Sequence, residues 1–183
     1  MKRGRQCEDG FTMVEMIITI AVSAILVGTI VATLGYISAG NAKRSAARFN
    51  SKLNTAQTET MMQAKPTYLY LFVDGGVKAV LSKEEYTTSH ELKNKVSTGV
   101  ESATDVGGSR VTVSLIPDDG SPASELNDTN MLRIAFKKAT GAYEYTELEG
   151  GASSTFFEEI EFAGGEKFKV TLVKATGKHV MSK

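Results

Sequence analysis

The chain has 183 residues, in which 21 lysine and arginine side chains balance 21 aspartate and glutamate side chains. This length suits one domain with an anchoring segment, since domains commonly contain ~100–150 residues, and the balanced charge gives no indication of nucleic acid or an acidic lipid surface as a partner. Cys7 is the one cysteine, so the chain cannot form an internal disulfide.

Residues 11–37 form a long apolar segment in which Glu15 and Tyr36 are the only ionisable side chains. About 20 such residues suffice to cross the ~30 Å hydrocarbon core of a bilayer. The apolar run of a secretory signal peptide is shorter, ~7–15 residues, and small residues follow it at a cleavage site. Residues 38–40, Ser-Ala-Gly, fit such a site weakly. We therefore predict that residues 11–40 form a membrane-spanning helix, with ordinary secretion as the alternative.

Glu15 lies near the start of this apolar segment. A carboxylate costs ~2.5–3.5 kcal/mol at the centre of a membrane helix, and less near the interface. An acidic side chain in this position therefore indicates a function and a cationic partner. The alternative is that Glu15 lies at the level of the lipid headgroups and is solvated there.

The residues on both sides of Glu15 form a specific pattern. A short, polar leader with three basic side chains covers residues 1–10 and ends at Gly10. Phe11 follows, Glu15 is the fifth residue counted from Phe11, and the apolar run continues beyond it. This combination resembles the signature of type IV prepilins.

The resemblance implies cleavage by prepilin peptidase between Gly10 and Phe11, followed by N-methylation of the new amino group of Phe11. It also implies that Glu15 pairs with the N-terminal ammonium group of a neighbouring subunit during assembly. Pairing offsets part of the cost of removing two opposite charges from water. Cleavage would thus create the cation that Glu15 needs.

Two features differ from many major pilins. No proline precedes Pro66, so the apolar segment lacks a helix-breaking residue, and a disulfide in the C-terminal part is impossible. Both features are closer to pseudopilins, minor pilins or pilins of Gram-positive bacteria.

Small residues recur at every fourth position of the apolar segment, at Ala24, Gly28 and Ala32. Small residues at this spacing allow helices to approach closely in lipid. We therefore expect this face to take part in helix packing, although small residues are common in membrane helices generally.

Residues 41–65 continue the helical pattern but are amphipathic. One face is predicted to be buried, because its residues are spaced by three or four positions: Ala42, Ala46, Phe49, Leu53, Ala56 and Thr60. Pro66 disfavours helical geometry at Lys65, so we expect the helix to end near that residue. This half of the helix should pack against a soluble head.

The remaining residues, 66–183, are predicted to form a β-sheet head. Alternating apolar residues and turn signals predict these strands: 67–73 with 77–81, 110–116, 131–137 with 142–147, and 160–162 with 167–174. Residues 82–96 are predicted to form a polar helix or an irregular crossover capped by Ser82. Tyr68, Tyr70 and Phe72 are expected to pack on the long helix. The fold class is α+β, with an antiparallel sheet laid across the helix.

No catalytic constellation is found in the sequence. His90 and His179 are the only histidines, and His179 is expected to be solvated. Asp118, Asp119 and Asp128 could hold calcium, but they lack the spacing of an EF-hand loop, so we expect a solvated acidic loop. We expect no metal, no cofactor and no enzymatic activity.

The resemblance therefore implies a structural subunit of a type IV pilus, either a major or a minor pilin, in which the membrane-spanning helix of residues 11–40 also serves in polymerisation. The alternative within the same class is a pseudopilin of a type II secretion or competence DNA-uptake system. An alternative of another class is a signal-anchored surface binding protein that does not polymerise.

The partners expected for a pilin are prepilin peptidase, other pilin subunits and the pilus or secretion assembly machinery. Nucleic acid is expected only for a competence pseudopilin. The precursor should be a single-pass membrane protein with its head outside the cytoplasm, and the mature subunit should lie in a cell-surface pilus or pseudopilus.

Overall fold

The computed structural model describes residues 12–151 and 155–183, and the side chains of residues 30–40 lie outside this description. The chain divides into two compact units between Tyr36 and Ile37. The second unit, residues 37–183, is called the head below.

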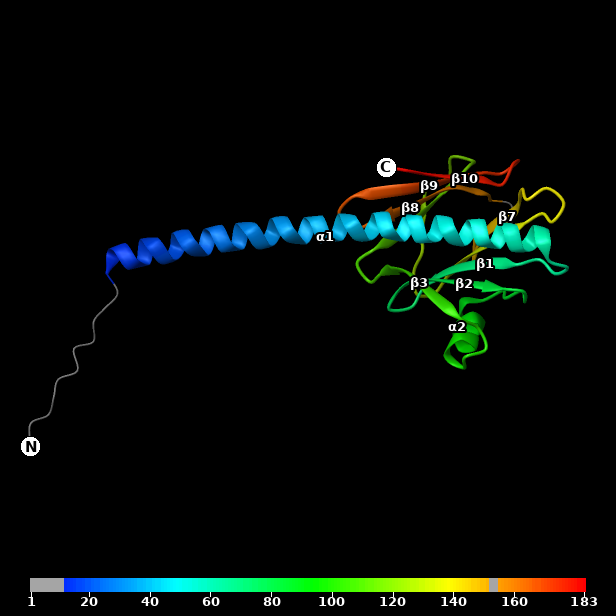
Figure 1. Cartoon of the computed structure of the whole chain (residues 1–183), viewed down its shortest axis with the longest axis horizontal. Helices are drawn as coiled ribbons and strands as arrows, with labels where there is room; N and C mark the ends of the chain where they lie inside the picture. The colour runs from blue at the N-terminus through cyan, green and yellow to red at the C-terminus, as the bar shows by residue number, and fades with distance from the viewer. Residues whose placement is uncertain (1–11, 152–154) are drawn as a thin grey trace, which may run out of the picture. The chain divides into compact units, whose positions relative to one another are not determined.

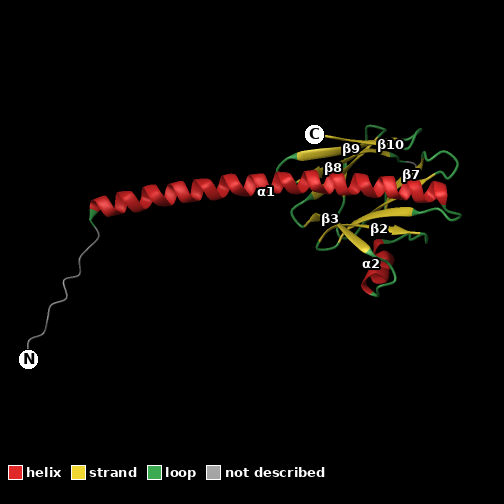
Figure 2. Cartoon of the chain, viewed as in Figure 1, coloured by secondary structure: helices red, strands yellow, loops and turns green. Residues whose placement is uncertain are grey.

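A single helix, α1 (Met13–Met62), includes residues of both units (Figures 1 and 2). In the head, the predicted face of α1 is confirmed, because its six residues are all fully buried: Ala42, Ala46, Phe49, Leu53, Ala56 and Thr60. The helix ends at Met62, slightly before the predicted end. The hydroxyl of Thr60 accepts a hydrogen bond from the amide of Thr67 and donates one to its carbonyl oxygen, both at 3.1 Å. These bonds fix the chain reversal around Pro66.

The first sheet has five strands in the order β3-β2-β1-β6-β7, and all neighbours are antiparallel. Its strands are β1 (Tyr68–Val73), β2 (Gly76–Ser82), β3 (Ala103–Gly108), β6 (Met131–Phe136) and β7 (Tyr143–Leu148). The two hairpins predicted in this region, β1–β2 and β6–β7, are confirmed.

The second sheet also has five strands, in the order β10-β9-β8-β4-β5. Its strands are β4 (Thr112–Pro117), β5 (Ser124–Glu125), β8 (Phe157–Ala163), β9 (Lys167–Val173) and β10 (Lys178–Ser182). The predicted β8–β9 hairpin is confirmed. The prediction of one sheet is wrong, since the described head contains two, and β3, β5 and β10 were not predicted.

The buried face of α1 joins both sheets in one hydrophobic core. The first sheet contributes Leu69 and Leu71 of β1 to this core, among others, and the second sheet contributes Phe162 of β8. The ring centroids of Phe49 and Phe162 lie 5.5 Å apart. The second half of α1 is therefore a structural part of the head. This arrangement of a helix followed by antiparallel sheets confirms the α+β class.

A second hydrophobic cluster covers the opposite face of the first sheet. There Tyr70 and Phe72 pack with Tyr86 and with Leu92 of α2 (Ser89–Ser97). Tyr68 is partly buried against the same cluster, so the prediction that Tyr68, Tyr70 and Phe72 pack on the long helix is wrong. Alternation along a strand places residues 70 and 72 on one face and residues 69 and 71 on the other, and α1 covers the odd-numbered set.

The predicted helix cap at Ser82 is also wrong. Ser82 is the last residue of β2, where it pairs with Tyr68. The cap of α2 is Thr88, whose side chain accepts a hydrogen bond from the amide of Glu91. Both Ser82 and Thr88 precede a glutamate by three residues, which is the capping-box spacing. Ser82 is paired within β2 and cannot cap a helix, so only Thr88 begins one.

Candidate processing and assembly site

The start of α1 is fixed by a reciprocal contact between Thr12 and Glu15. The backbone amide and the hydroxyl of Thr12 both donate to Oε2 of Glu15, each at 2.9 Å. In return, the amide of Glu15 donates to the Thr12 hydroxyl at 3.3 Å. This is a capping box, in which two side chains satisfy the free amides of the first helical turn.

The carboxylate of Glu15 retains capacity for a further partner. Oε2 holds both contacts to Thr12, and within the described residues Oε1 makes no hydrogen bond and Glu15 makes no ion pair. An ionised carboxylate has about four acceptor positions. Glu15 is exposed and can therefore accept from an ammonium group while it still caps the helix.

Thr12 was not singled out by the sequence analysis. The signal was present, because Thr12 and Glu15 have the threonine-x-x-glutamate spacing of a capping box just before an apolar run. The predicted cleavage residues Gly10 and Phe11, and the predicted methylation of Phe11, lie outside the described residues, so they stay predictions.

The following part of α1 presents apolar side chains on all sides. Every residue of 12–29 is exposed. The exposed apolar side chains of this segment are Met13, Val14, Met16, Ile17, Ile18, Ile20, Val22, Ile25, Leu26 and Val27. An exposed apolar surface of this extent marks a contact with a membrane or another protein.

Ala24 and Gly28 lie together in a groove on this surface. The groove is shallow and open to solvent, and four further residues of the same helix line it: Thr19, Ile20, Ser23 and Val27. A Cβ atom added at Gly28 would meet nothing within 4 Å, so the surface is open there. The side chain of Ala32, the third residue of the predicted packing face, lies outside the described residues. The role of this face in helix packing stays a prediction.

The hydroxyl groups of the segment are satisfied within the helix. Thr19 donates to the carbonyl oxygen of Met16 at 2.9 Å, and Ser23 donates to that of Thr19 at 2.7 Å. Such internal bonds make hydroxyl groups compatible with apolar surroundings. Among the residues that the structure describes, no helix has the length and apolarity required to cross a membrane.

Asp118, Asp119 and Asp128 are the acidic residues that the sequence offered as a possible calcium site. In the described residues, no three histidine, cysteine, aspartate or glutamate side chains come together as metal ligands would. Asp119 accepts from the amide of Ser121 at 2.8 Å, and contacts with Ser121 lower the pKa of the Asp119 carboxyl. Its carboxylate thus stabilises its own loop.

The prediction that His179 is solvated is wrong. His179 lies on β10, is partly buried, and its Nδ1 is 3.2 Å from the hydroxyl of Tyr143. Burial lowers the pKa of its imidazole, and a contact with the carbonyl oxygen of Gly177 opposes this shift. The sequence did not predict β10, which pairs with β9 and turns the side chains of His179 and Met181 toward its more buried face.

Comparison with known proteins gives one positive finding. Residues 5–31 match the family model of the prokaryotic N-terminal methylation motif. No curated protein and no solved structure matches the chain. The matched residues include the predicted cleavage position, Thr12, Glu15 and the groove at Ala24 and Gly28. The chain therefore carries, over residues 5–31, the N-terminal cleavage and methylation signal of type IV pilins and pseudopilins.

Proposed function

We propose that the chain is a structural subunit of a type IV pilus, made as a membrane-anchored precursor and assembled through its N-terminal helix. Prepilin peptidase would cut between Gly10 and Phe11, and the new amino group of Phe11 would be methylated. The observation that carries this proposal is the methylation motif at residues 5–31, followed directly by a helix with exposed apolar side chains.

The exposed part of α1 supports assembly through this helix. Exposed apolar side chains in this number are unfavourable in water. Lipid would bury them before assembly, and neighbouring subunits would bury them in the filament. The open groove at Ala24 and Gly28 would let a neighbouring helix approach closely.

Glu15 would guide the approach of each new subunit. The free Oε1 atom leaves room for the N-terminal ammonium group of a neighbouring Phe11, while Oε2 stays bound to Thr12. In apolar surroundings, an unpaired carboxylate is costly, so pairing favours the assembled state. The role of Thr12 is to hold the carboxylate in place for this contact.

A pseudopilin is the second candidate function. It is favoured by the absence of a proline before Pro66 and of any cysteine after Cys7. A signal-anchored binding protein, the third candidate, would not require cleavage at Gly10. The proposed pilus subunit would be displayed on the cell surface, whereas a pseudopilin would remain in a short filament of a secretion or DNA-uptake system.

The proposal is tested by the intact mass and N-terminal sequence of the protein isolated from its native membrane. A chain that begins at methylated Phe11 is the expected result. A chain that begins at Met1 would identify a plain anchor, and one that begins at Asn41 would identify ordinary secretion; either result would refute the proposal. Shearing of cells then separates the two filament types, because only a pilus yields long fibres.

A further inference from the structure

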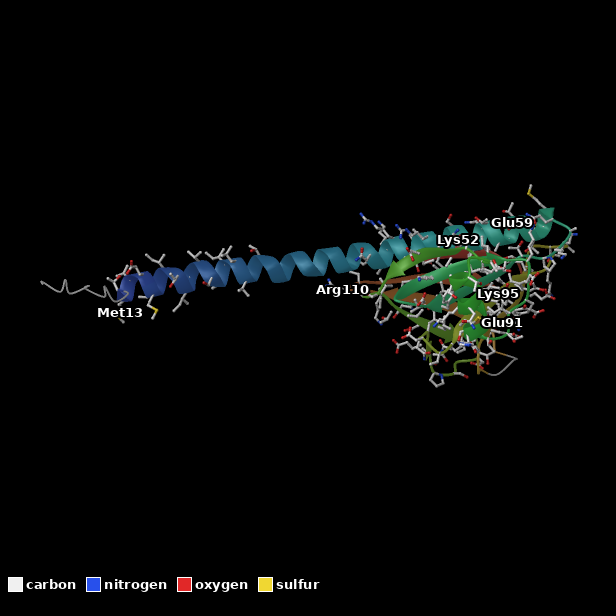
Figure 3. All side chains as sticks on the ribbon, turned by 90° about the horizontal axis from the view of Figure 1, so that it is seen from below. Met13, Lys52, Glu59, Glu91, Lys95 and Arg110 are labelled. Atoms are coloured by element: carbon white, nitrogen blue, oxygen red, sulfur yellow. The ribbon has the colours of Figure 1, made fainter. Side chains whose placement is uncertain are left out.

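The exposed side of α1 in the head carries a row of basic side chains. Arg44, Arg48 and Lys52 follow one another at intervals of four residues, so they lie on one side of the helix, about 6 Å apart along its axis. These three residues are called the basic stripe. Arg44 and Arg48 are exposed and Lys52 is partly exposed. Figure 3 shows Lys52 on α1, on a different part of the head from Glu91 and Lys95 of α2.

The head itself does not neutralise this stripe. Six ion pairs occur among the described residues, and none includes a residue of α1. Among the described residues, the one hydrogen bond from the stripe to the sheets runs from Nη1 of Arg48 to the backbone carbonyl oxygen of Asp105, at 3.3 Å. The only acidic residue of α1 within the head is Glu59, which accepts from the hydroxyl of Thr67 at 3.3 Å. The stripe therefore has no ion-pair partner among the described residues, and the one carboxylate in the cleft beside it is the exposed Asp105.

The surface next to the stripe is open to a partner. A cleft of about 480 Å³ lies between α1 and β3, lined by Arg48, Ser51, Lys52, Thr104 and Asp105. Ala47, Ser51 and Thr55 form a parallel row of small, exposed residues on the same side of α1. Small side chains beside long basic ones allow another protein surface to reach the charges.

The complementary charge is found on the same chain. Residues 41–65 contain five basic side chains and one acidic side chain, a formal charge of +4, whereas residues 66–183 contain 13 basic and 17 acidic side chains, a formal charge of −4. Several exposed acidic side chains of the second region have no ion-pair partner in the described structure: Glu84, Glu91, Glu125, Asp128, Glu144 and Glu158. A second copy of the chain therefore presents exposed carboxylates that could pair with the basic side chains of the stripe.

We propose that the basic stripe docks against exposed carboxylates of residues 66–183 in a second copy of this chain, and so orders neighbouring heads in the filament. This inference rests on the proposed function, because it needs assembled subunits. It differs from the contact of Glu15, which lies in the other compact unit. Complementary charges between two surfaces fix their register and exclude wrong arrangements.

The first test is cross-linking of the assembled, full-length protein in its native host. A carbodiimide joins lysine amines directly to carboxylates, without a spacer. Mixed filaments of light and isotope-labelled subunits identify links between copies. We expect links from Lys52, and from its exposed neighbour Lys43, to carboxylates of residues 66–183 of another copy. Links from these lysines only within one copy would overturn the inference.

The second test reverses the charge of the stripe. The triple variant Arg44→Glu, Arg48→Glu, Lys52→Glu should reduce assembled protein by more than about tenfold, because like charges across an interface are strongly unfavourable. The matched control is Lys83→Glu, Lys137→Glu, Lys178→Glu, which changes the net charge equally at exposed lysines of the head outside α1. Equal losses in both variants would show an effect of net charge and would contradict the inference.

The outcomes also separate this inference from the proposed function. If the unchanged protein is cut at Phe11 and assembles, but the stripe variant assembles normally, the stripe inference fails and the proposed function stands. If the unchanged protein never assembles, both fail. Normal assembly of the variant together with lost sedimentation with phosphatidylglycerol vesicles would overturn the inference and assign the stripe to a lipid surface.

Discussion

The side-chain amide of Gln57 donates a hydrogen bond to the backbone carbonyl oxygen of Gly141 at 2.7 Å. The same nitrogen lies 3.2 Å from the carbonyl oxygen of Gly177. Gly141 belongs to the turn between β6 and β7, and Gly177 to the turn between β9 and β10. A single side chain of α1 therefore joins the helix to one turn of each sheet.

Replacing Gln57 with glutamate should destabilise the head. The carboxylate has no N–H to donate, so two carbonyl oxygens would face a negative charge in a partly buried site. We expect a loss of about 1–3 kcal/mol in the free energy of unfolding, the usual cost of unpaired buried polar groups. Urea denaturation of the detergent-solubilised protein would measure it. Asn54→Asp, an equivalent change at an exposed position of α1, is the control and should have a much smaller effect.

Gly177 is predicted to be intolerant of any side chain. Its φ angle is +70°, and an added Cβ atom would collide with the carbonyl group of Gly141. Gly120 has a similar φ of +77°, but a Cβ atom there would meet nothing within 4 Å. Gly120→Ala should therefore cost about 1–2 kcal/mol from backbone strain alone, and Gly177→Ala should cost clearly more. Equal unfolding free energies for the two variants would show that the two turns do not pack closely.

The stability of the head should decrease in mild acid because of His179. Burial lowers the pKa of its imidazole in the folded state, whereas in the unfolded chain the pKa is about 6.5. Between these two pKa values the unfolded state binds more protons, so stability rises with pH. The contribution is complete above pH ~6.5 and is lost as the pH falls through the folded pKa. Urea denaturation of His179→Gln at several pH values should show a smaller dependence over this range. An unchanged dependence would refute this assignment.

Local patterns predicted the helix and several hairpins, because neighbouring residues determine these elements. The spacing of Phe49 and Leu53 identified the buried face of α1, and the glycines at Gly75 and Gly141 marked two hairpin turns, where both adopt positive φ. The division of the strands into two sheets was not predicted, although the β8–β9 hairpin of the second sheet was. The second sheet forms because β4 pairs with β8, a strand that is distant in the sequence. Local sequence patterns do not show which distant strand will pair with β4.

The missed strands have weak sequence signals for a physical reason. β3 contains an aspartate and two glycines, residues that are uncommon in strands, and it forms because β2 offers a partner. At the candidate site, the sequence identified Glu15 from its charge in an apolar segment. It did not reveal the contact with Thr12, because the capping-box interpretation requires the helix to begin at Met13 rather than at Phe11.

The two contacts of Glu15 can be separated by a pair of substitutions. Glu15→Gln removes the negative charge but retains an oxygen that can accept from Thr12, since glutamine also functions in a capping box. Thr12→Val removes the hydroxyl and leaves the charge of Glu15 intact. If Glu15 pairs with the ammonium group of another subunit, Glu15→Gln should reduce the amount of assembled protein strongly, and Thr12→Val only modestly. If Glu15 serves mainly to begin the helix, Thr12→Val should be the more harmful change.

Assembled and unassembled protein can be compared after shearing and sedimentation, with the mass of the processed chain measured in both fractions. Normal processing in both variants is the expected control result, because it places any defect after cleavage. Normal assembly of Glu15→Gln would contradict the ammonium contact, and the first turn of α1 would then be explained by capping alone.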